Sequence, residues 1–164
     1  MVRIRAAEPK DRPLIEDMLA EAADWRAAVV TRPTATVMAD PELGHYASDW
    51  PKPRDFGLVA EDDQGGSVGA AWWRFFTADH PGYGFVDAAT PELAMGVLAG
   101  KRGLGVGSAL LEALVQAARA ERLPRLSLSV EPDNYAVRMY ERAGFEKRAE
   151  TGGSWTMVLD LSRR

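Results

Sequence analysis

Apolar residues alternate with polar ones at the start of the chain, where arginines separate Val2, Ile4 and Ala6. A period of two is typical of a strand with one buried face. Strand patterns recur over residues 56–61, 67–76, 92–98, 126–130 and 155–161. Residues 62–66, Asp-Asp-Gln-Gly-Gly, favour a turn, which predicts that residues 56–61 and 67–76 pair as an antiparallel hairpin.

A helical period of three to four residues marks three other segments. The first follows Asp11 and Pro13, and the clearest covers residues 108–119. The third covers residues 134–143, where Gly144 is expected to end the helix in a left-handed conformation. Residues 25–55 are irregular and rich in proline, with room for one short helix over residues 36–50. The order of these elements predicts one mixed sheet with helices on its faces.

Composition narrows the class of protein. The chain has 164 residues, 46% of them hydrophobic, which suits a single domain with its own core. The net charge of −4 disfavours nucleic acid as a partner, because phosphate backbones require clustered positive charge. The absence of cysteine excludes disulfides and thiolate nucleophiles and fits a cytoplasmic location. We find no signal-peptide pattern and no apolar run of about 20 residues, the length that spans a bilayer.

Candidate chemistry is concentrated in residues 98–108, Leu-Ala-Gly-Lys-Arg-Gly-Leu-Gly-Val-Gly-Ser, between a predicted strand and a predicted helix. Glycines allow the backbone to approach a ligand closely, and a helix N-terminus offers unpaired N–H groups, so the segment suits an anion such as phosphate. It is not a Walker loop, since no Lys-Ser or Lys-Thr pair follows the last glycine. Nor does it match the dinucleotide fingerprint, because Leu110 holds the third glycine position. An ordinary glycine-rich turn is the alternative reading.

A family resemblance favours the ligand-binding reading. Arg102, Gly105 and Gly107 are spaced as in the pyrophosphate-binding motif of the GNAT superfamily of acyl-CoA N-acyltransferases, which this segment resembles. Residues 128–145 resemble that family's second signature, in which a strand ends and is followed by Asn, a helix containing Ala and Tyr, and Gly-Phe. The resemblance covers nearly the whole chain except residues 25–55. It implies a GNAT-like α/β fold of the α+β type in a single domain, residues 1–164, with a mixed, mostly antiparallel sheet of about seven strands and about four helices.

The same resemblance implies acetyl-CoA as the co-substrate and no metal. Backbone N–H groups of residues 102–108 are expected to hold the diphosphate, and Val97 and Leu98 to pair with the pantetheine arm in a gap between residues 92–98 and 126–130. The full set of cofactor-binding residues that it implies is Val97, Leu98, Arg102, Gly103, Leu104, Gly105, Val106, Gly107, Ser108, Asn134 and Tyr140.

Tyr140 matches the family's general acid, which protonates the departing thiolate. Its helical spacing is also that of a core tyrosine. The general base must take a proton from an amine that is mostly charged at neutral pH. Ser129 stands where some members carry glutamate, so we expect Glu92 to be the base, although a solvated strand-end charge is the equal alternative. Asp87, Glu131 and His80 are weaker candidates.

The acceptor pocket is expected between residues 25–55 and 70–77, lined by Trp25, Trp72, Trp73 and Asp87. Adjacent residues on a strand point to opposite faces, so one of Trp72 and Trp73 is expected in the core and the other in the pocket. Residues 25–55 are long enough to cover a site, which favours the primary amine of a small molecule as acceptor. A protein or peptide N-acetyltransferase and a CoA-binding sensor without catalysis stay as alternatives. We expect neither nucleic acid nor membrane as a partner and leave a homodimer open.

Overall fold

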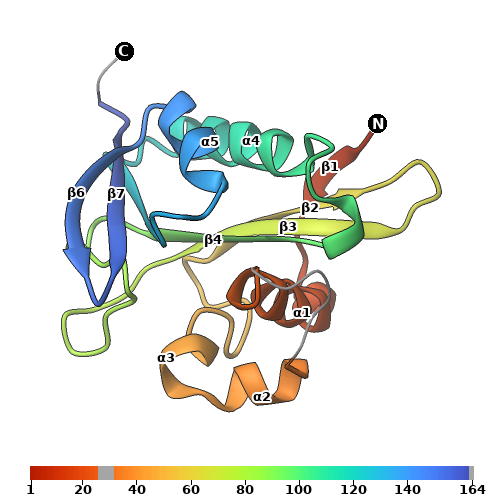
Figure 1. Cartoon of the computed structure of the whole chain (residues 1–164), viewed down its shortest axis with the longest axis horizontal. Helices are drawn as coiled ribbons and strands as arrows, with labels where there is room; N and C mark the ends of the chain where they lie inside the picture. Colours follow the sequence, from red (N-terminus) through yellow and green to blue (C-terminus); the bar gives the residue numbers. More distant parts are fainter. Residues whose placement is uncertain (26–31, 163–164) are drawn as a thin grey trace. The chain divides into compact units, whose positions relative to one another are not determined.

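A computed structural model describes residues 1–25 and 32–162, and Figure 1 shows the course of the chain. The seven strands in this described part are β1 (Arg3–Ala6), β2 (Phe56–Glu61), β3 (Ser67–Arg74), β4 (Glu92–Val97), β5 (Arg125–Val130), β6 (Glu146–Thr151) and β7 (Ser154–Asp160). They form a hydrogen-bonded series in the order β1-β2-β3-β4-β5-β7-β6. Pairing is antiparallel between β1 and β2, β2 and β3, β5 and β7, and β6 and β7, and parallel between β4 and β5. This confirms the expected mixed, mostly antiparallel sheet.

Five α-helices lie in the described residues, close to the expected number of about four. They are α1 (Arg12–Ala23), α2 (Thr34–Ala39), α3 (Pro41–Gly44), α4 (Val106–Ala120) and α5 (Ala136–Arg142). The difference arises in residues 25–55, which contain two short helices where one was expected. Asp40 separates them: its side chain accepts the Glu42 N–H at 2.9 Å as an N-cap, and Pro41 supplies the first residue of α3. Residues 26–31 lie outside the described part.

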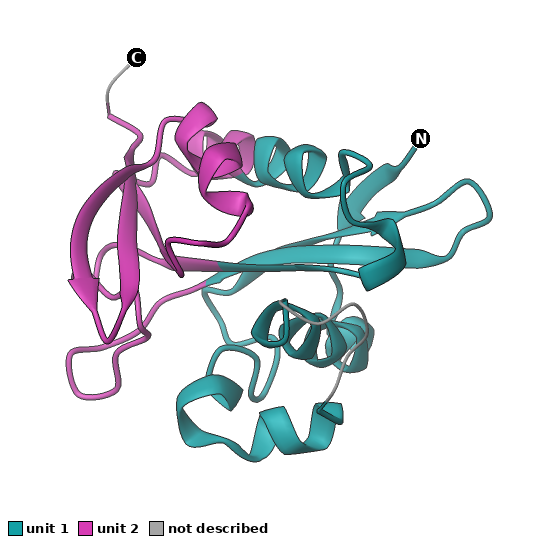
Figure 2. Ribbon diagram, viewed as in Figure 1, with its two compact units in different colours: residues 1–73, 94–114 teal, residues 74–93, 115–164 magenta. Residues whose placement is uncertain are grey.

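The chain divides into two compact units (Figure 2). Unit 1 comprises Met1–Trp73 and Ala94–Leu114, and unit 2 comprises Arg74–Leu93 and Val115–Arg164. Helix α4 and strand β4 each contribute residues to both units.

Unit 1 is built on the antiparallel strands β1, β2 and β3. The predicted hairpin between β2 and β3 is present, and the Asp62 carboxylate closes its turn by accepting the N–H groups of Gln64 and Gly66 at 3.0 and 2.9 Å. Helix α1 lies very close to β4, because a Cβ atom placed on Gly96 would be 2.0 Å from the Met18 carbonyl oxygen. A glycine at this position is therefore what allows α1 and β4 to touch.

Unit 2 joins β5, β7 and β6 with the helix α5. Gly144 ends α5 with a φ of +104°, the left-handed conformation expected from the sequence. The following residue, Phe145, is 2% exposed and donates its N–H to the Tyr140 carbonyl at 3.0 Å. The chain therefore turns back on the helix and packs a hydrophobic ring against it.

Strand β6 was not expected from the sequence. All six of its residues are exposed, so they carry no apolar period, and only pairing with β7 shows the strand. Element bounds also moved slightly: α4 begins at Val106 and α5 at Ala136, each two residues from the expected position. None of the described helices has the length and apolarity needed to cross a membrane.

Candidate active site

The glycine-rich segment forms a tight turn between β4 and α4, both ends of which are anchored. Leu98 donates its N–H to the Val68 carbonyl at 2.9 Å and accepts the Lys101 N–H at 2.8 Å, so the turn starts from the edge of β3. Gly103 and Gly105 then have φ values of +78° and +86°. This left-handed conformation is strained for residues with a side chain, which explains two of the glycines in the segment.

The N-terminus of α4 presents unused donors to this turn. Ala109 donates to the Gly105 carbonyl at 3.0 Å, which is the first bond of the helix. The preceding N–H groups, those of Val106, Gly107 and Ser108, therefore have no acceptor within the helix, and the helix dipole adds partial positive charge there. A Cβ atom placed on Gly103 or Gly105 would meet no atom of the described residues within 4 Å, so both glycines border open space. These features fit a diphosphate held by backbone donors.

A surface pocket adjoins the turn within unit 1. Its lining combines the turn and the start of α4 with the β2–β3 hairpin and the first residues of the chain: Met1, Val2, Asp62, Asp63, Gln64, Val68, Lys101, Leu104 and Val106. Leu104 is 70% exposed, an unusual state for a leucine. An apolar side chain is thus displayed directly beside the open face of the turn.

The Arg102 side chain is used inside the protein. Its guanidinium donates to the carbonyls of Val97, Trp25 and Glu21 at 3.2, 3.1 and 3.1 Å. The Leu98 N–H is already bonded to β3, and the pairing of the Leu98 backbone with a pantetheine arm stays a prediction. Val97 stays as the expected partner on β4.

Tyr140 lies on α5 and is 8% exposed. Its ring meets Phe145 edge to face, with centroids 5.8 Å apart. Burial raises the pKa of the Tyr140 phenol above its ordinary value of 10.0. The group is therefore neutral at physiological pH, which is the state that a proton donor needs.

The structure shows Asn134 in a local hydrogen bond and Glu92 buried, neither of which the sequence suggested. The Asn134 side-chain oxygen accepts the Ala136 N–H at 2.8 Å and so closes the turn that leads into α5. Glu92 is only 2% exposed, and it lies opposite Ser127 in the β4–β5 pairing. The alternative of a solvated strand-end charge is thus excluded for Glu92, and its role as a base stays a prediction.

Asp87 and the tryptophans are held by contacts within their own units. Asp87 forms an ion pair with Arg125 at 2.8 Å. Trp72 and Trp73 are 0% and 3% exposed, and their ring N–H groups donate to the carbonyls of Tyr46 and Arg54. Both rings therefore lie in the core, and the expectation that one of them lines a pocket is wrong for this structure. Of the three tryptophans expected to line the pocket, only Trp25 is partly exposed.

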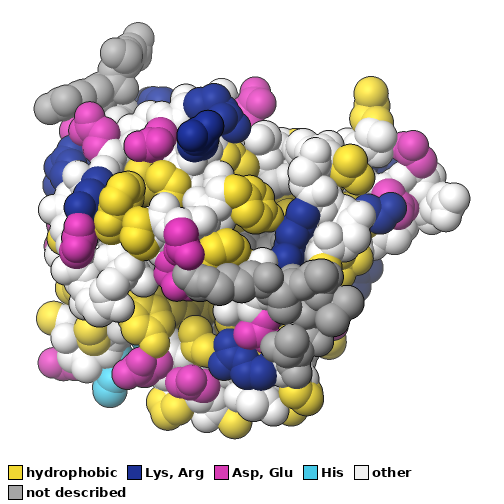
Figure 3. Space-filling model, in the orientation of Figure 1, with side chains coloured by type: hydrophobic (Ala, Val, Ile, Leu, Met, Phe, Trp, Pro, Cys, Tyr) yellow, Lys and Arg dark blue, Asp and Glu magenta, His cyan; other side chains and the backbone are white. Residues whose placement is uncertain are grey.

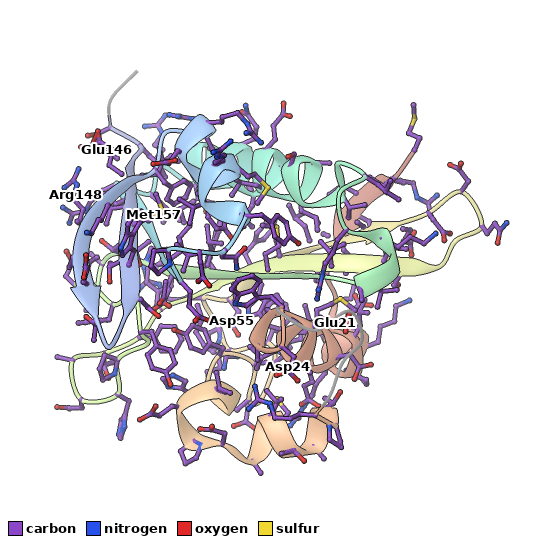
Figure 4. All side chains as sticks on the ribbon, in the orientation of Figure 1. Glu21, Asp24, Asp55, Glu146, Arg148 and Met157 are labelled. Atoms are coloured by element: carbon purple, nitrogen blue, oxygen red, sulfur yellow. The ribbon has the colours of Figure 1, made fainter. Side chains whose placement is uncertain are left out.

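Sequence reasoning missed Glu21, a buried carboxylate on α1 (Figure 4). Its Oε1 atom accepts the Ala99 N–H at 2.9 Å. Glu21 lies on the same face of α1 as the buried Met18. Its burial could not be predicted from the residue type, because a glutamate in a helix is usually solvated. No local pattern in the sequence points to its partner, which lies 78 residues further along the chain.

A mixed sheet in which a glycine turn leads into a helix N-terminus is an arrangement suited to binding an anion through backbone N–H groups. The model of the acetyltransferase (GNAT) family matches residues 20–145, and the chain belongs to this family. A mycothiol acetyltransferase from Propionibacterium freudenreichii is 36% identical over 121 residues, which cover 73% of this chain and 36% of the relative. The chain spans about a third of the length of the curated relatives that it matches.

Solved structures share the fold at low sequence identity. An N-acetyltransferase from Staphylococcus aureus Mu50 aligns with a TM-score of 0.69 and 20% identity, covering 98% of this chain and 99% of that chain. A Salmonella typhimurium structure, described as an acetyltransferase with its cofactor acetyl-CoA, aligns with a TM-score of 0.69 and 23% identity, covering 99% and 95%. At this identity the likeness shows a common fold.

Proposed function

We propose that this chain transfers an acetyl group from acetyl-CoA to the primary amine of a small molecule, by direct attack in a ternary complex. One observation carries the proposal: in a member of the GNAT family, two left-handed glycines border open space directly before α4, whose first N–H groups have no acceptor within the helix. Phosphate groups bind well to such donors. The co-substrate supplies the thioester that the amine attacks.

The chain's own groups would then divide the work. Backbone N–H groups from Arg102 to Ser108 bind the diphosphate, and the Val97 backbone pairs with the pantetheine arm. The Tyr140 phenol, kept neutral by burial, donates a proton to the departing sulfur. Glu92 stays as the proposed base; at 2% exposure it needs a water or a local rearrangement to reach an amine.

A small-molecule acceptor fits the surface and the relatives. Acidic and basic side chains are interspersed on the face that Figure 3 shows, with no basic field of the kind that binds nucleic acid. The curated relatives carry the name mycothiol acetyltransferase. We propose that the enzyme acts as a single domain in the cytoplasm.

The test is a thiol-release assay with acetyl-CoA against a panel of amines, combined with calorimetry of coenzyme A binding. The panel includes amino acids, polyamines, aminoglycosides, peptides and mycothiol lacking its acetyl group. We expect coenzyme A to bind and at least one small amine to accelerate thiol release. Absence of binding overturns the proposal, and acceleration by peptides alone corrects the acceptor class. Binding without release by any amine indicates a sensor in place of an enzyme.

A further inference from the structure

The glycine turn is fastened to helix α1 by two side chains. From the turn, Arg102 reaches back to the last residues of α1 and the end of β4, and its three bonded carbonyls belong to Glu21, Trp25 and Val97. From the helix, Glu21 reaches forward to the Ala99 N–H. All of these residues lie in unit 1.

The guanidinium of Arg102 acts as a rigid fork in this arrangement. Its side chain is 16% exposed, and Nε, Nη1 and Nη2 each donate to a different carbonyl. The Glu21 carbonyl lies in the last turn of α1, where carbonyls lack helical partners and attract cations, and the Trp25 carbonyl lies two residues beyond the end of the helix. Arg102 therefore completes the helix end and fixes the path of its own turn in one step.

Glu21 is an unexpected neighbour for a turn that binds an anion. Burying a carboxylate is unfavourable unless it is compensated, and here Arg102 Nη2 lies 4.0 Å from Glu21 Oε1. The same oxygen accepts the Ala99 N–H at 2.9 Å, a charge-assisted hydrogen bond. This bond also removes Ala99 from the set of donors that a diphosphate can use.

Close contact between backbones leaves these bonds little freedom. Gly96 allows the Met18 carbonyl to approach β4 so closely that any side chain at position 96 would collide with it. Helix α1 is therefore held at a fixed distance from the strand that leads into the turn. Helix α1 therefore sets the position of the turn, because the side chains of Glu21 and Arg102 bond the helix and the turn to each other at adjacent points.

We propose that Glu21 and Arg102 are positioning residues that pre-organise the turn for its diphosphate ligand. The inference rests on the proposed function, since it names how that same site is held in its binding shape. A turn that is already ordered loses less conformational freedom on binding, which raises affinity without any direct contact. Neither side chain touches the ligand in this proposal.

Glu21 offers the sharper test, because no backbone or side-chain group of Glu21 is assigned to the ligand. Glu21→Ala removes the acceptor for the Ala99 N–H, whereas Glu21→Gln keeps an acceptor oxygen at the same distance along the side chain. Glu16→Ala is the control, because Glu16 is a partly exposed residue of the same helix that pairs with Arg12 at the surface. In the free protein, we expect the Ala99 amide hydrogen to exchange at least tenfold faster in Glu21→Ala, since a buried charge-assisted bond is lost. Exchange in Glu21→Gln and Glu16→Ala should stay within about threefold of wild type.

Ligand binding supplies the second readout. Glu21→Ala should raise the dissociation constant for coenzyme A and the KM for acetyl-CoA about tenfold or more, with kcat at saturation changed less than about threefold. Glu21→Gln should rescue most of the affinity. Unchanged coenzyme A affinity in Glu21→Ala overturns the inference, and so does an equal loss in Glu16→Ala. If Glu21→Ala does not fold, Arg102→Lys, which keeps the charge but loses the fork, must show the same rise in KM.

The inference and the proposed function fail in different ways. If wild-type protein does not bind coenzyme A, the proposed function fails. If wild type binds and the Glu21 variants bind equally well, only the positioning role fails.

Discussion

The phenol of Tyr140 shows how burial can set the protonation state of one residue. Desolvation disfavours the phenolate, which raises the pKa of Tyr140 above its ordinary value of 10.0. A general acid must carry its proton when the reaction needs it. Between pH 6 and 9 this phenol therefore carries its proton.

Replacing Tyr140 with Phe removes the proton donor but keeps the ring that packs on Phe145. We expect kcat to fall about 10²-fold, the typical contribution of a general acid, with little change in the KM for acetyl-CoA. In wild type, the pH profile of kcat should show no loss from this group up to pH 9, because its raised pKa lies higher. Steady-state kinetics from pH 6 to 9 measure both.

Tyr135→Phe is the matched control for this experiment. Tyr135 comes just before the same helix and is 62% exposed, so its hydroxyl has no place in the proposed chemistry. Its kcat should stay near wild type. A Tyr140→Phe enzyme with full turnover would remove the acid role from Tyr140.

Gly105 tests the turn itself. The φ of Gly105 is +86°, so Gly105→Val places a β-branched residue in the left-handed region at a cost of roughly 1–2 kcal/mol. The added side chain also fills the space in which the diphosphate would contact the backbone of the turn. We expect coenzyme A binding to be lost in calorimetry. Gly100→Ala is the control, since Gly100 has no positive φ and equally open surroundings. Equal binding by both variants would contradict the assignment of the turn.

The residues of the candidate site differ in how far the sequence could predict them. Gly105 and Tyr140 stand in local motifs, so their neighbours in sequence identify them. Trp72, by contrast, was expected on either face, and its burial depends on bonding with Tyr46, 26 residues away. Glu21 escaped altogether, because the feature that defines it is a contact with a distant backbone N–H.

At the scale of elements, Arg5 joins β1 to the start of α1 and to β2. It donates to both carboxylate oxygens of Asp11 at 2.8 and 2.9 Å and to Glu61 at 3.0 Å. Asp11 also accepts the Glu8 N–H at 2.7 Å, which closes the short turn before α1. One bidentate pair therefore sets where the first helix begins relative to the first strand.

The Arg5 guanidinium lowers the pKa of the Asp11 carboxyl below its ordinary value, chiefly through the hydrogen bonds between them. The pKa is lower in the folded state than in the unfolded state, where it is near 3.9, so the pair stabilises the fold above about pH 4. This stabilisation is lost as pH falls through the folded-state pKa.

Asp11→Asn should therefore lower the free energy of unfolding at pH 7 by about 2 kcal/mol, the scale of a hydrogen bond to a charged group. The difference from wild type should shrink as pH falls below about 4. Urea unfolding at a series of pH values measures this. Asp63→Asn, at a side chain that is 81% exposed, should change stability by less than about 0.5 kcal/mol at any of these values. A difference for Asp11→Asn that does not depend on pH would contradict the pairing.

Helices and strands with a stripe of buried apolar residues could be predicted from the sequence, and those without such a stripe could not. The β2–β3 hairpin and α4 follow from apolar periodicity and turn residues within their own sequence. Strand β6 reads Glu-Lys-Arg-Ala-Glu-Thr, with every residue exposed, and exists because β7 offers a free edge. Its charges make that outer edge a poor template for further pairing.

For the whole molecule, the two compact units raise the question of whether the chain behaves as one domain. Each unit has a hydrophobic core: Ile15, Met18 and Val59 are buried in unit 1, and Leu128, Phe145 and Met157 in unit 2. The division does not fall in a linker, however. It passes through β3, between Trp73 and Arg74, through β4, between Leu93 and Ala94, and through α4, between Leu114 and Val115.

Domain boundaries normally lie in exposed linkers that few contacts cross. A boundary inside a 15-residue helix means that unfolding either unit breaks a helix whose remainder belongs to the other. Short helices are marginal by themselves, so each half of α4 depends on the other. We therefore expect one cooperative unfolding transition for residues 1–164.

The five tryptophans make this testable without mutation. Four of them, Trp25, Trp50, Trp72 and Trp73, lie in unit 1, whereas Trp155 alone lies in unit 2, so fluorescence reports mainly on unit 1. Far-ultraviolet circular dichroism reports on both units. Coincident thermal transitions by the two probes, with equal calorimetric and van't Hoff enthalpies, are the expected result. A fluorescence transition that ends before the circular dichroism has changed fully would mean that unit 1 unfolds by itself, and that α4 does not join the two units into one domain.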